Sequence, residues 1–348
     1  MRIRPASLYR NTFFILGCGL LLYAFYCLVA YDDKSHVDVH RRQKHLYLTV
    51  SKDRLSLIGA TDAVVFHAAD IADGPLPDAK DRRSNQRYVF LSMETPHNSG
   101  FHAVPLNFFN WTATYLLSSD VVFKYGVYFL PAKVAEEKGF KFTVSGTVVH
   151  TKKSGILGFI SNCNTSSKRE LALRELSKYM NVTIGGKCAS NRDNVNLCPS
   201  GQDCTSLYSD YPFYLAVENS VCKDYISEKY WERLSVPSVP IVMRRKVFES
   251  ITIPPHSFIA MDDYASPKEM AADLIRLEKA YAEYFAWRNG GWTAAPWNAP
   301  GYRNGYCRLC ERLWEENQEP KVIPDVWTWF KSESQCEGAD FVKNWIGL

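Results

Sequence analysis

The segment from Phe213 to Leu234 constrains the fold of this chain more than any other. It opens with the apolar run Phe213–Val217, which is typical of a strand buried on both faces. The polar residues Glu218–Ser220 follow directly. Polar and aromatic side chains then recur at helical spacing over Tyr225–Glu232. The segment therefore predicts a strand, a polar loop and a helix in succession.

An open α/β sheet binds anionic ligands where a strand ends in a polar loop and a helix begins. Lys229 is suited to a diphosphate at such a place, and a carboxylate such as Glu228 is suited to sugar hydroxyls. This combination favours a nucleotide-sugar as ligand. A surface helix with scattered charges explains the same spacing equally well, so periodicity alone leaves both interpretations open.

The same alternation of strands and helices extends over the rest of the chain. Short strands are predicted at Ala63–Phe66, Arg87–Met93 and Ile156–Ile160. A helix is predicted over Lys168–Met180, and another starts at Ser266, which precedes a proline and a capping glutamate. Because 348 residues suffice for two ordinary domains, the pattern predicts an α/β fold with two Rossmann-like domains facing a cleft.

The N-terminal region contains an apolar run, Thr12–Tyr31, that is long enough to cross a bilayer. Three arginines precede it and two aspartates follow it. The positive-inside rule then predicts a cytoplasmic tail at 1–11, a transmembrane helix at 12–31, a short stem at 32–45 and a lumenal remainder. A cleaved signal peptide is the alternative, but the run exceeds the usual apolar core and no clear A-x-A site follows.

The cysteines indicate an oxidising compartment. Cys18 and Cys27 lie in the apolar run. The other eight are an even number and are predicted to form disulfides: Cys163, Cys188, Cys198, Cys204, Cys222, Cys307, Cys310 and Cys336. The C-x-x-C pair at 307 and 310 also occurs in zinc and redox sites, but no second C-x-x-C or nearby histidine pair accompanies it.

Charge and short motifs narrow the possible partners. The net charge is only +4 and no basic block is present, which argues against nucleic acid as a partner. No two aspartates have D-x-D spacing, so we predict no metal site of that kind. Glycosylation sequons, which suit a lumenal domain, occur at Asn110, Asn164 and Asn181.

Several motifs identify a family. Residues 218–229 read E-N-S-V-C-K-D-Y-I-S-E-K and resemble the signature of the α1,3-fucosyltransferases. V-P-I-V at 239–242, I-P-P-H-S-F-I at 253–259 and T-D-A-V-V-F-H at 61–67 are similar to further motifs of that family. The resemblance covers most of residues 50–315 and consists of many fixed letters in the right order.

The resemblance implies an inverting, GDP-fucose-using enzyme of the GT-B fold, anchored as a single-pass type II protein in the Golgi cisterna membrane. It places an acceptor-side Rossmann-like domain at 46–150 and a GDP-fucose-binding domain with a cysteine-rich C-terminal wrap at 151–348. The implied partners are GDP-fucose and a glycoprotein glycan. No cofactor is required, and a divalent metal at most stimulates the reaction.

The same resemblance assigns site residues. Glu94 stands in E-T-P where the family has its catalytic glutamate in E-S-P, and it follows a predicted strand end. A general base there would take the proton of the acceptor hydroxyl; an exposed strand-end carboxylate is the alternative. Arg169 and Lys229 match cations that neutralise the diphosphate. The full set of predicted donor-binding residues is Arg169, Tyr225, Glu228, Lys229, Asn162 and Asn219.

Two features bear on the acceptor. Arg244-Arg245 and the G-Y-C-R-L-C run at 305–310 resemble the invertebrate and plant members that fucosylate O3 of the N-glycan core GlcNAc. A Lewis-type enzyme acting on N-acetyllactosamine is the alternative. A catalytically inactive Golgi glycan-binding relative is a third hypothesis, because the N-terminal domain looks shortened. Asn164 lies within the donor-side motif, so we expect it to be poorly glycosylated.

Overall fold

The structure is a computed structural model that describes residues 61–73, 75–126, 128–137, 153–199, 201–234, 236–279, 284, 292–295, 305–315 and 320–348. The predicted tail at 1–11, transmembrane helix at 12–31 and stem at 32–45 lie outside these residues. None of the helices in the described ranges is long and apolar enough to cross a membrane.

The chain forms two compact units, and each contains separate stretches of sequence. Among the described residues, the first comprises those within 61–93, 99–124 and 305–329. The second comprises those within 94–98, 125–295 and 330–348.

The predicted domain boundary at residue 150 stays a prediction. In the structure the described residues after 303 and up to Trp329 belong to the first unit. Helix α7 (Gly305–Trp314) packs on β4 (Val121–Val122). Its Leu309 joins the same hydrophobic cluster as Phe123. Burial of this apolar face places the segment after residue 303 in the first unit.

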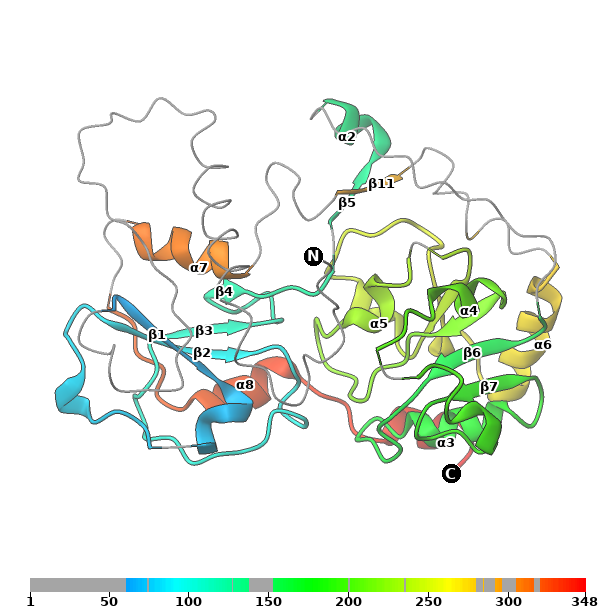
Figure 1. The fold of residues 1–348 in the computed structure, drawn as a ribbon, viewed down its shortest axis with the longest axis horizontal. Coiled ribbons are helices and arrows are strands. Elements are labelled where there is room, and N and C mark those ends of the chain that lie inside the picture. The colour runs from blue at the N-terminus through cyan, green and yellow to red at the C-terminus, as the bar shows by residue number, and fades with distance from the viewer. Residues whose placement is uncertain are drawn as a thin grey trace. The chain divides into compact units, whose positions relative to one another are not determined.

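The first unit is built on a parallel sheet in the order β1-β2-β3-β4 (Figure 1). Its strands are β1 (Ala63–His67), β2 (Arg87–Ser92), β3 (Trp111–Thr114) and β4 (Val121–Val122). The buried apolar run of β2 explains why it forms a central strand, and β3, which reads W-T-A-T, is buried along its whole length. Two 3₁₀ turns, η2 (Ala68–Asp73) and η3 (Ala79–Asp81), connect β1 to β2.

The second unit contains a parallel sheet of five strands in the order β10-β9-β8-β6-β7. The strands are β6 (Ile156–Phe159), β7 (Val182–Gly185), β8 (Phe213–Leu215), β9 (Val239–Val242) and β10 (Ile259–Ala260). Counted from β6 along the chain and read from the β7 edge, the order is 2-1-3-4-5. This is a doubly wound order with its reversal between β6 and β8.

Helices cover both faces of this sheet (Figure 1). One core cluster contains residues of α3 (Arg169–Leu176), α6 (Pro267–Leu277) and α9 (Asp340–Trp345). The other contains residues of α4 (Thr205–Ser209) and α5 (Glu228–Trp231). The chain therefore leaves β6 toward one face and leaves β8 toward the other.

The remaining elements are short. Strands β5 (Tyr128–Pro131) and β11 (Trp292–Ala295) pair antiparallel, and α2 (Ala132–Glu137) follows β5. Helix α8 (Val326–Ser334) carries the chain from the first unit into the second. Three 3₁₀ turns complete the second unit: η4 (Arg192–Asn194), η5 (Arg245–Phe248) and η6 (Met261–Asp263).

The structure confirms the α/β class and the predicted strands, whereas the helices are shorter than predicted. The helix after Ser266 has the expected cap, because the Ser266 side chain accepts a hydrogen bond from the Glu269 amide. The helix predicted over Tyr225–Glu232 begins only at Glu228. Asp224 has a positive φ of 61° just before Tyr225, and Ser227 caps the helix, so no helical turn precedes it.

The cysteines form disulfides between Cys163 and Cys188, Cys198 and Cys204, and Cys222 and Cys336. Cys307 is also disulfide-bonded. Cys310 is free, so its prediction as a disulfide cysteine is wrong. Burial raises the pKa of the Cys310 thiol to about 11. Because Cys310 is free, the disulfide of Cys307 does not join the two cysteines of the C-x-x-C motif.

Asn110, one of the three predicted glycosylation sites, is a structural residue of the first unit. Its side chain is 5% exposed. Its Oδ1 accepts hydrogen bonds from the Tyr88 amide, at 2.8 Å, and from the Arg82 guanidinium. Its Nδ2 donates to the Lys321 carbonyl at 2.8 Å. One amide thus connects β2, the loop before it and the C-terminal segment.

We expect glycopeptide mapping of the protein made in eukaryotic cells to find a glycan at the exposed Asn181 and none at Asn110. A glycan is attached through the side-chain amide nitrogen, which in Asn110 is buried and already donates a hydrogen bond. Folded protein that carries a glycan on Asn110 would contradict this expectation.

Candidate active site

The candidate site lies at the carboxyl ends of β6 and β8, where the strand order reverses. Ligands of open parallel sheets bind at such a switch point. The loop after β6 spans 160–168 and leads to α3, and the loop after β8 spans 216–227 and leads to α5. Both loops carry the residues that the sequence motifs single out.

Serine hydroxyls join the two loops. The Ser166 and Ser220 hydroxyls lie 2.8 Å apart. The Ser167 hydroxyl donates to the Glu218 carbonyl at 2.9 Å, and the Ser167 amide donates to the Asn219 carbonyl at 3.1 Å. Sequence reasoning missed these serines, because isolated serines in a loop have no diagnostic spacing.

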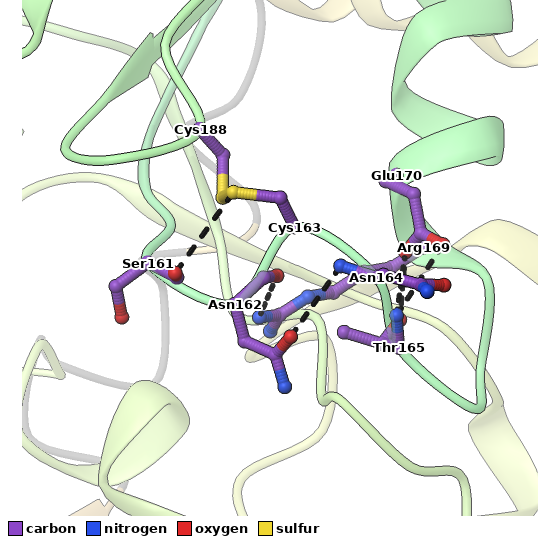
Figure 2. The surroundings of a disulfide bond; sticks show 8 residues. All are labelled: Ser161, Asn162, Cys163, Asn164, Thr165, Arg169, Glu170 and Cys188. Atoms are coloured by element: carbon purple, nitrogen blue, oxygen red, sulfur yellow. Dashed lines mark hydrogen bonds between the residues drawn. A yellow bond between two sulfur atoms is a disulfide. The ribbon is translucent and has the colours of Figure 1, made fainter.

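Arg169, the first residue of α3, is the central cation of the site. Its side chain is 4% exposed. One terminal nitrogen donates to the Val217 carbonyl at 2.7 Å. The other donates to the Asn162 carbonyl at 3.3 Å (Figure 2). Its Nε is buried without a hydrogen-bond partner among the described residues.

The charge of Arg169 is not neutralised by a direct ion pair. In the described part of the chain no carboxylate oxygen lies within 4 Å of its guanidinium. Burial lowers the pKa of Arg169, although an arginine remains protonated at neutral pH. A buried cation without a carboxylate partner favours an anionic ligand, because the ligand restores the electrostatic energy lost by burial.

Lys229, the second predicted diphosphate ligand, has a different environment. Its ammonium lies 3.0 Å from the Glu218 carboxylate and 3.1 Å from the Glu228 carboxylate. It also donates to the Ser227 hydroxyl at 2.8 Å. Burial lowers the pKa of Lys229, but the two carboxylates outweigh burial, so the pKa is raised.

Glu218 organises this group, although it was not among the predicted site residues. Its carboxylate accepts hydrogen bonds from the Ser227 amide at 2.8 Å and the Ser227 hydroxyl at 3.0 Å. Burial raises the pKa of Glu218 against the opposing effect of Lys229. Burial also acts to raise the pKa of Glu228, but Lys229 lowers it below its ordinary value. Glu228 is exposed, so its carboxylate can also reach a ligand.

Tyr225 connects this loop to Glu94. Its ring is 1% exposed, and its hydroxyl donates to the Glu94 carboxylate at 3.0 Å. Burial and the carboxylates of Glu218 and Glu94 raise the pKa of Tyr225. The phenol therefore keeps its proton and acts as a donor to Glu94.

Glu94 belongs to a short segment, Glu94–Asn98, that lies in the second unit with the loop after β8. Asn98 anchors this segment, because its Nδ2 donates to Thr95 Oγ1 at 3.0 Å and to Ser220 Oγ at 3.2 Å. The Glu94 side chain is exposed. Its carboxylate is thus held by Tyr225 and remains open to solvent, as a general base requires.

The three asparagines of the donor-side motifs have less defined contacts. Asn162 is exposed and supplies its carbonyl to Arg169. Asn219 supplies its carbonyl to Ser166 and Ser167, and its buried Oδ1 has no partner within the described residues. Asn164 is exposed, and its Oδ1 accepts from Lys168 at 2.6 Å.

One group of potential metal ligands occurs in the described part of the chain. It comprises His97, Cys222 and Cys336, whose ligand atoms lie within 4.8 Å of one another. Cys222 and Cys336 are joined in a disulfide, so only the His97 imidazole is available as a metal ligand.

Comparison with known proteins identifies the family. Residues 149–329 match "Glycosyltransferase family 10 (fucosyltransferase) C-term", and residues 32–126 match "Fucosyltransferase, N-terminal". The chain belongs to the α1,3-fucosyltransferases of glycosyltransferase family 10. It is therefore a glycosyltransferase.

Three curated relatives illustrate the similarity. The α-(1,3)-fucosyltransferase fut-5 of Caenorhabditis elegans is 32% identical over 80% of this chain and 74% of its own length. The α-(1,3)-fucosyltransferase fut-1 of the same organism is 31% identical over 74% of this chain and 60% of the relative. The glycoprotein 3-α-L-fucosyltransferase A of Drosophila melanogaster is 32% identical over 83% of this chain and 55% of its own length.

Replacing Tyr225 in this fucosyltransferase tests whether the hydroxyl positions Glu94 or binds the donor. For Tyr225→Phe we expect kcat to fall about tenfold while KM for the donor changes less than about twofold, because a contact to the base affects mainly the chemical step. Steady-state kinetics measure both, with Tyr179→Phe on the exposed surface as the matched control. An increase in KM at unchanged kcat would assign Tyr225 to donor binding.

Proposed function

We propose that this fucosyltransferase transfers L-fucose from GDP-fucose, with inversion, to O3 of a GlcNAc in glycoprotein glycans. One observation carries the proposal: the loop Val217–Tyr225 contacts both a buried cation and an exposed carboxylate. Its first carbonyl accepts from Arg169, and its last side chain donates to Glu94. A single loop thereby connects a diphosphate-binding charge to a general base.

The donor side follows from the charges around this loop. A GDP leaving group carries negative charge that increases in the transition state. Arg169 is a preorganised cation that has no direct carboxylate partner in the described part of the chain, so its charge is available to the diphosphate. Lys229 is compensated by Glu218 and Glu228, so we assign it to holding the loop and to the edge of the donor site. Glu228 is placed to accept hydrogen bonds from donor hydroxyls.

The transfer step uses these groups in one displacement. The acceptor O3 attacks C1 of fucose and forms the new C–O bond, while the bond between C1 and the β-phosphate oxygen breaks. Glu94 takes the O3 proton, and GDP departs with the bonding electron pair. The Tyr225 hydroxyl keeps the Glu94 carboxylate in position. No cofactor takes part in these steps as we propose them.

The acceptor is assigned from sequence features and relatives. The Arg244-Arg245 pair and the G-Y-C-R-L-C run favour the N-glycan core, and the Drosophila relative is named a glycoprotein fucosyltransferase. In this structure Arg244 pairs with Asp262 and Glu337, and Arg245 pairs with Asp263. These arginines therefore stabilise the second unit, and the pair supports the acceptor assignment only as a sequence similarity.

The same proposal places the protein in the Golgi cisterna membrane as a type II protein with a lumenal GT-B catalytic domain. The apolar run Thr12–Tyr31 with its flanking charges supports the topology. The disulfides of the second unit and the sequons suit an oxidising lumen.

Arg169→Lys tests the donor side. Lysine keeps the charge but lacks the planar guanidinium of arginine. The guanidinium donates to two carbonyls and still has a further N–H donor for phosphate. We expect the affinity for GDP to fall at least about tenfold, as in other sites that lose a charge-assisted contact. Titration calorimetry with GDP measures the change. Arg174→Lys, on the exposed side of the same helix, is the control and should bind GDP like the parent protein.

The activity test incubates the purified chain with GDP-fucose and glycans that contain N-glycan core or N-acetyllactosamine, with a chelator present. We expect fucose transfer that Glu94→Gln reduces about 10³-fold, because an amide cannot accept the proton. Glu232→Gln, an exposed carboxylate beside α5, should leave transfer unchanged.

Product analysis by mass spectrometry and NMR then identifies the linkage. Fucose on O3 of the core GlcNAc supports the assigned acceptor, and fucose on N-acetyllactosamine would replace it with a Lewis-type activity. A folded protein that binds GDP without any transfer would favour the inactive glycan-binding relative.

A further inference from the structure

The residues at the end of helix α8, Ser334–Glu337, contact the middle of the loop Val217–Tyr225. We call these four residues the strap, and they belong to the second unit, as the loop does. The Lys223 amide donates to the carbonyl of the first strap residue at 2.8 Å. The amide of the last strap residue donates to the Val221 carbonyl at 2.8 Å. The loop and the strap are therefore paired through their backbones.

A disulfide lies between these two hydrogen bonds. It joins Cys222 of the loop to Cys336 of the strap, which is 114 residues later in the sequence. The Cys222 side chain is 1% exposed. A hydrogen bond can be exchanged for one to water, whereas the disulfide cannot. Three successive loop residues are thus attached to one short segment, with the covalent bond in the middle.

The strap is itself attached to the body of the second unit. The Glu337 carboxylate lies 3.1 Å from the Arg244 guanidinium and also pairs with Lys246. Helix α9, which follows the strap, buries Trp345 in the same hydrophobic cluster that contains Val221. The strap is therefore held by charge on one side and by the core on the other, so it can hold the loop in turn.

The disulfide also lies next to the segment that carries the proposed base. A ring nitrogen of His97 lies within 4.8 Å of both sulfurs. His97 belongs to the segment Glu94–Asn98, three residues after Glu94. On the loop side, Tyr225 follows Cys222 by three residues and donates to Glu94 at 3.0 Å. The disulfide is therefore close to both chain segments that determine where the Glu94 carboxylate lies.

The turn between Cys222 and Tyr225 is tightly bonded. The Tyr225 amide donates to the Cys222 carbonyl at 3.2 Å, so the turn is closed. Inside it, Asp224 has a positive φ of 61° and is 8% exposed. Its carboxylate accepts from the Ser250 hydroxyl at 2.7 Å. Because this turn is closed and buried, a displacement of Cys222 also displaces the Tyr225 ring.

We propose that the disulfide between Cys222 and Cys336 is a positioning device for the transfer step. It orients the Tyr225 hydroxyl and, through it, the Glu94 carboxylate. The inference rests on the proposed role of Glu94 as general base. The disulfide itself takes no part in the reaction. The other end of the loop is held independently, because the Val217 carbonyl accepts from Arg169 and serine hydroxyls bridge the two loops. Donor binding therefore does not depend on the disulfide.

Cys222→Ala combined with Cys336→Ala removes the bond and leaves no thiol. Titration calorimetry with GDP counts the folded sites, and steady-state kinetics then give kcat per GDP-binding site. We expect kcat per site to fall about tenfold while the GDP affinity and KM for the donor stay within about twofold. A purely structural role would reduce the number of sites and leave kcat per site unchanged. Cys310→Ala, which removes a free thiol, is the control and should keep the parent kcat.

A double-mutant cycle tests whether the disulfide acts through Tyr225. Tyr225→Phe alone is expected to lower kcat about tenfold. In the disulfide-free variant the same substitution should lower kcat by less than about a further twofold, because the hydroxyl that it removes no longer holds the carboxylate. Two independent tenfold losses that multiply would show that the disulfide acts on another group, and they would overturn the proposal.

The outcomes distinguish the positioning role from the proposed function. If the disulfide-free variant transfers fucose with the parent kcat, the positioning role is overturned while the proposed function stands. If Glu94→Gln keeps the parent activity, or the parent protein transfers no fucose, the proposed function fails and the positioning role fails with it.

A second variant serves if the disulfide-free protein does not fold. Glu337→Gln keeps the disulfide but loses the charge that pairs with Arg244 and Lys246. We expect kcat to fall about threefold at unchanged GDP affinity, since the loss of a partly exposed ion pair loosens the strap. An unchanged kcat overturns the proposal. Asp340→Asn, an exposed carboxylate just after the strap, is the matched control and should behave like the parent protein.

Discussion

The second unit depends on the burial of one positive charge. The Arg169 guanidinium is held at the end of a parallel sheet by two backbone carbonyls, and it has no direct carboxylate partner among the described residues. Burying such a charge is unfavourable unless a ligand compensates it. The neighbouring serine bridges and the disulfide from Cys163 to Cys188 keep the loops in place around it. The site is thereby prepared for an anion.

Two cations that look equivalent in the sequence have different roles. Arg169 and Lys229 both occur in family motifs and both suit a phosphate. Glu218 and Glu228 surround Lys229, and the resulting pair secures the start of α5 through Ser227. Arg169 has no direct carboxylate partner among the described residues, and Glu218, Glu170 and Glu228 act on its charge only from a longer distance. The difference arises from Glu218, whose side chain turns back toward Ser227, and no local pattern predicts that contact.

Residues outside the site also match a sequence motif and yet have a different role in the structure. Asn110 lies in a glycosylation sequon, but its side-chain amide already forms hydrogen bonds with Tyr88, Arg82 and Lys321. Two of these partners lie more than twenty residues earlier in the chain, and the third lies more than two hundred residues later. Cys310 likewise satisfies a disulfide pattern, but it is free while its neighbour in the motif, Cys307, is disulfide-bonded.

The sequence by itself determined the α/β class, the predicted strands and the family, and it singled out Arg169, Lys229 and Glu94 as candidates for the site. Apolar strand patterns and family motifs involve residues that are close together in the chain, so they can be recognised in the sequence. Only the tertiary structure decided which cation is compensated, that Tyr225 donates to Glu94, that the C-terminal segment contributes to both units, and that Cys222 pairs with Cys336. These features depend on contacts between residues distant in sequence, because burial and charge compensation are set by three-dimensional neighbours.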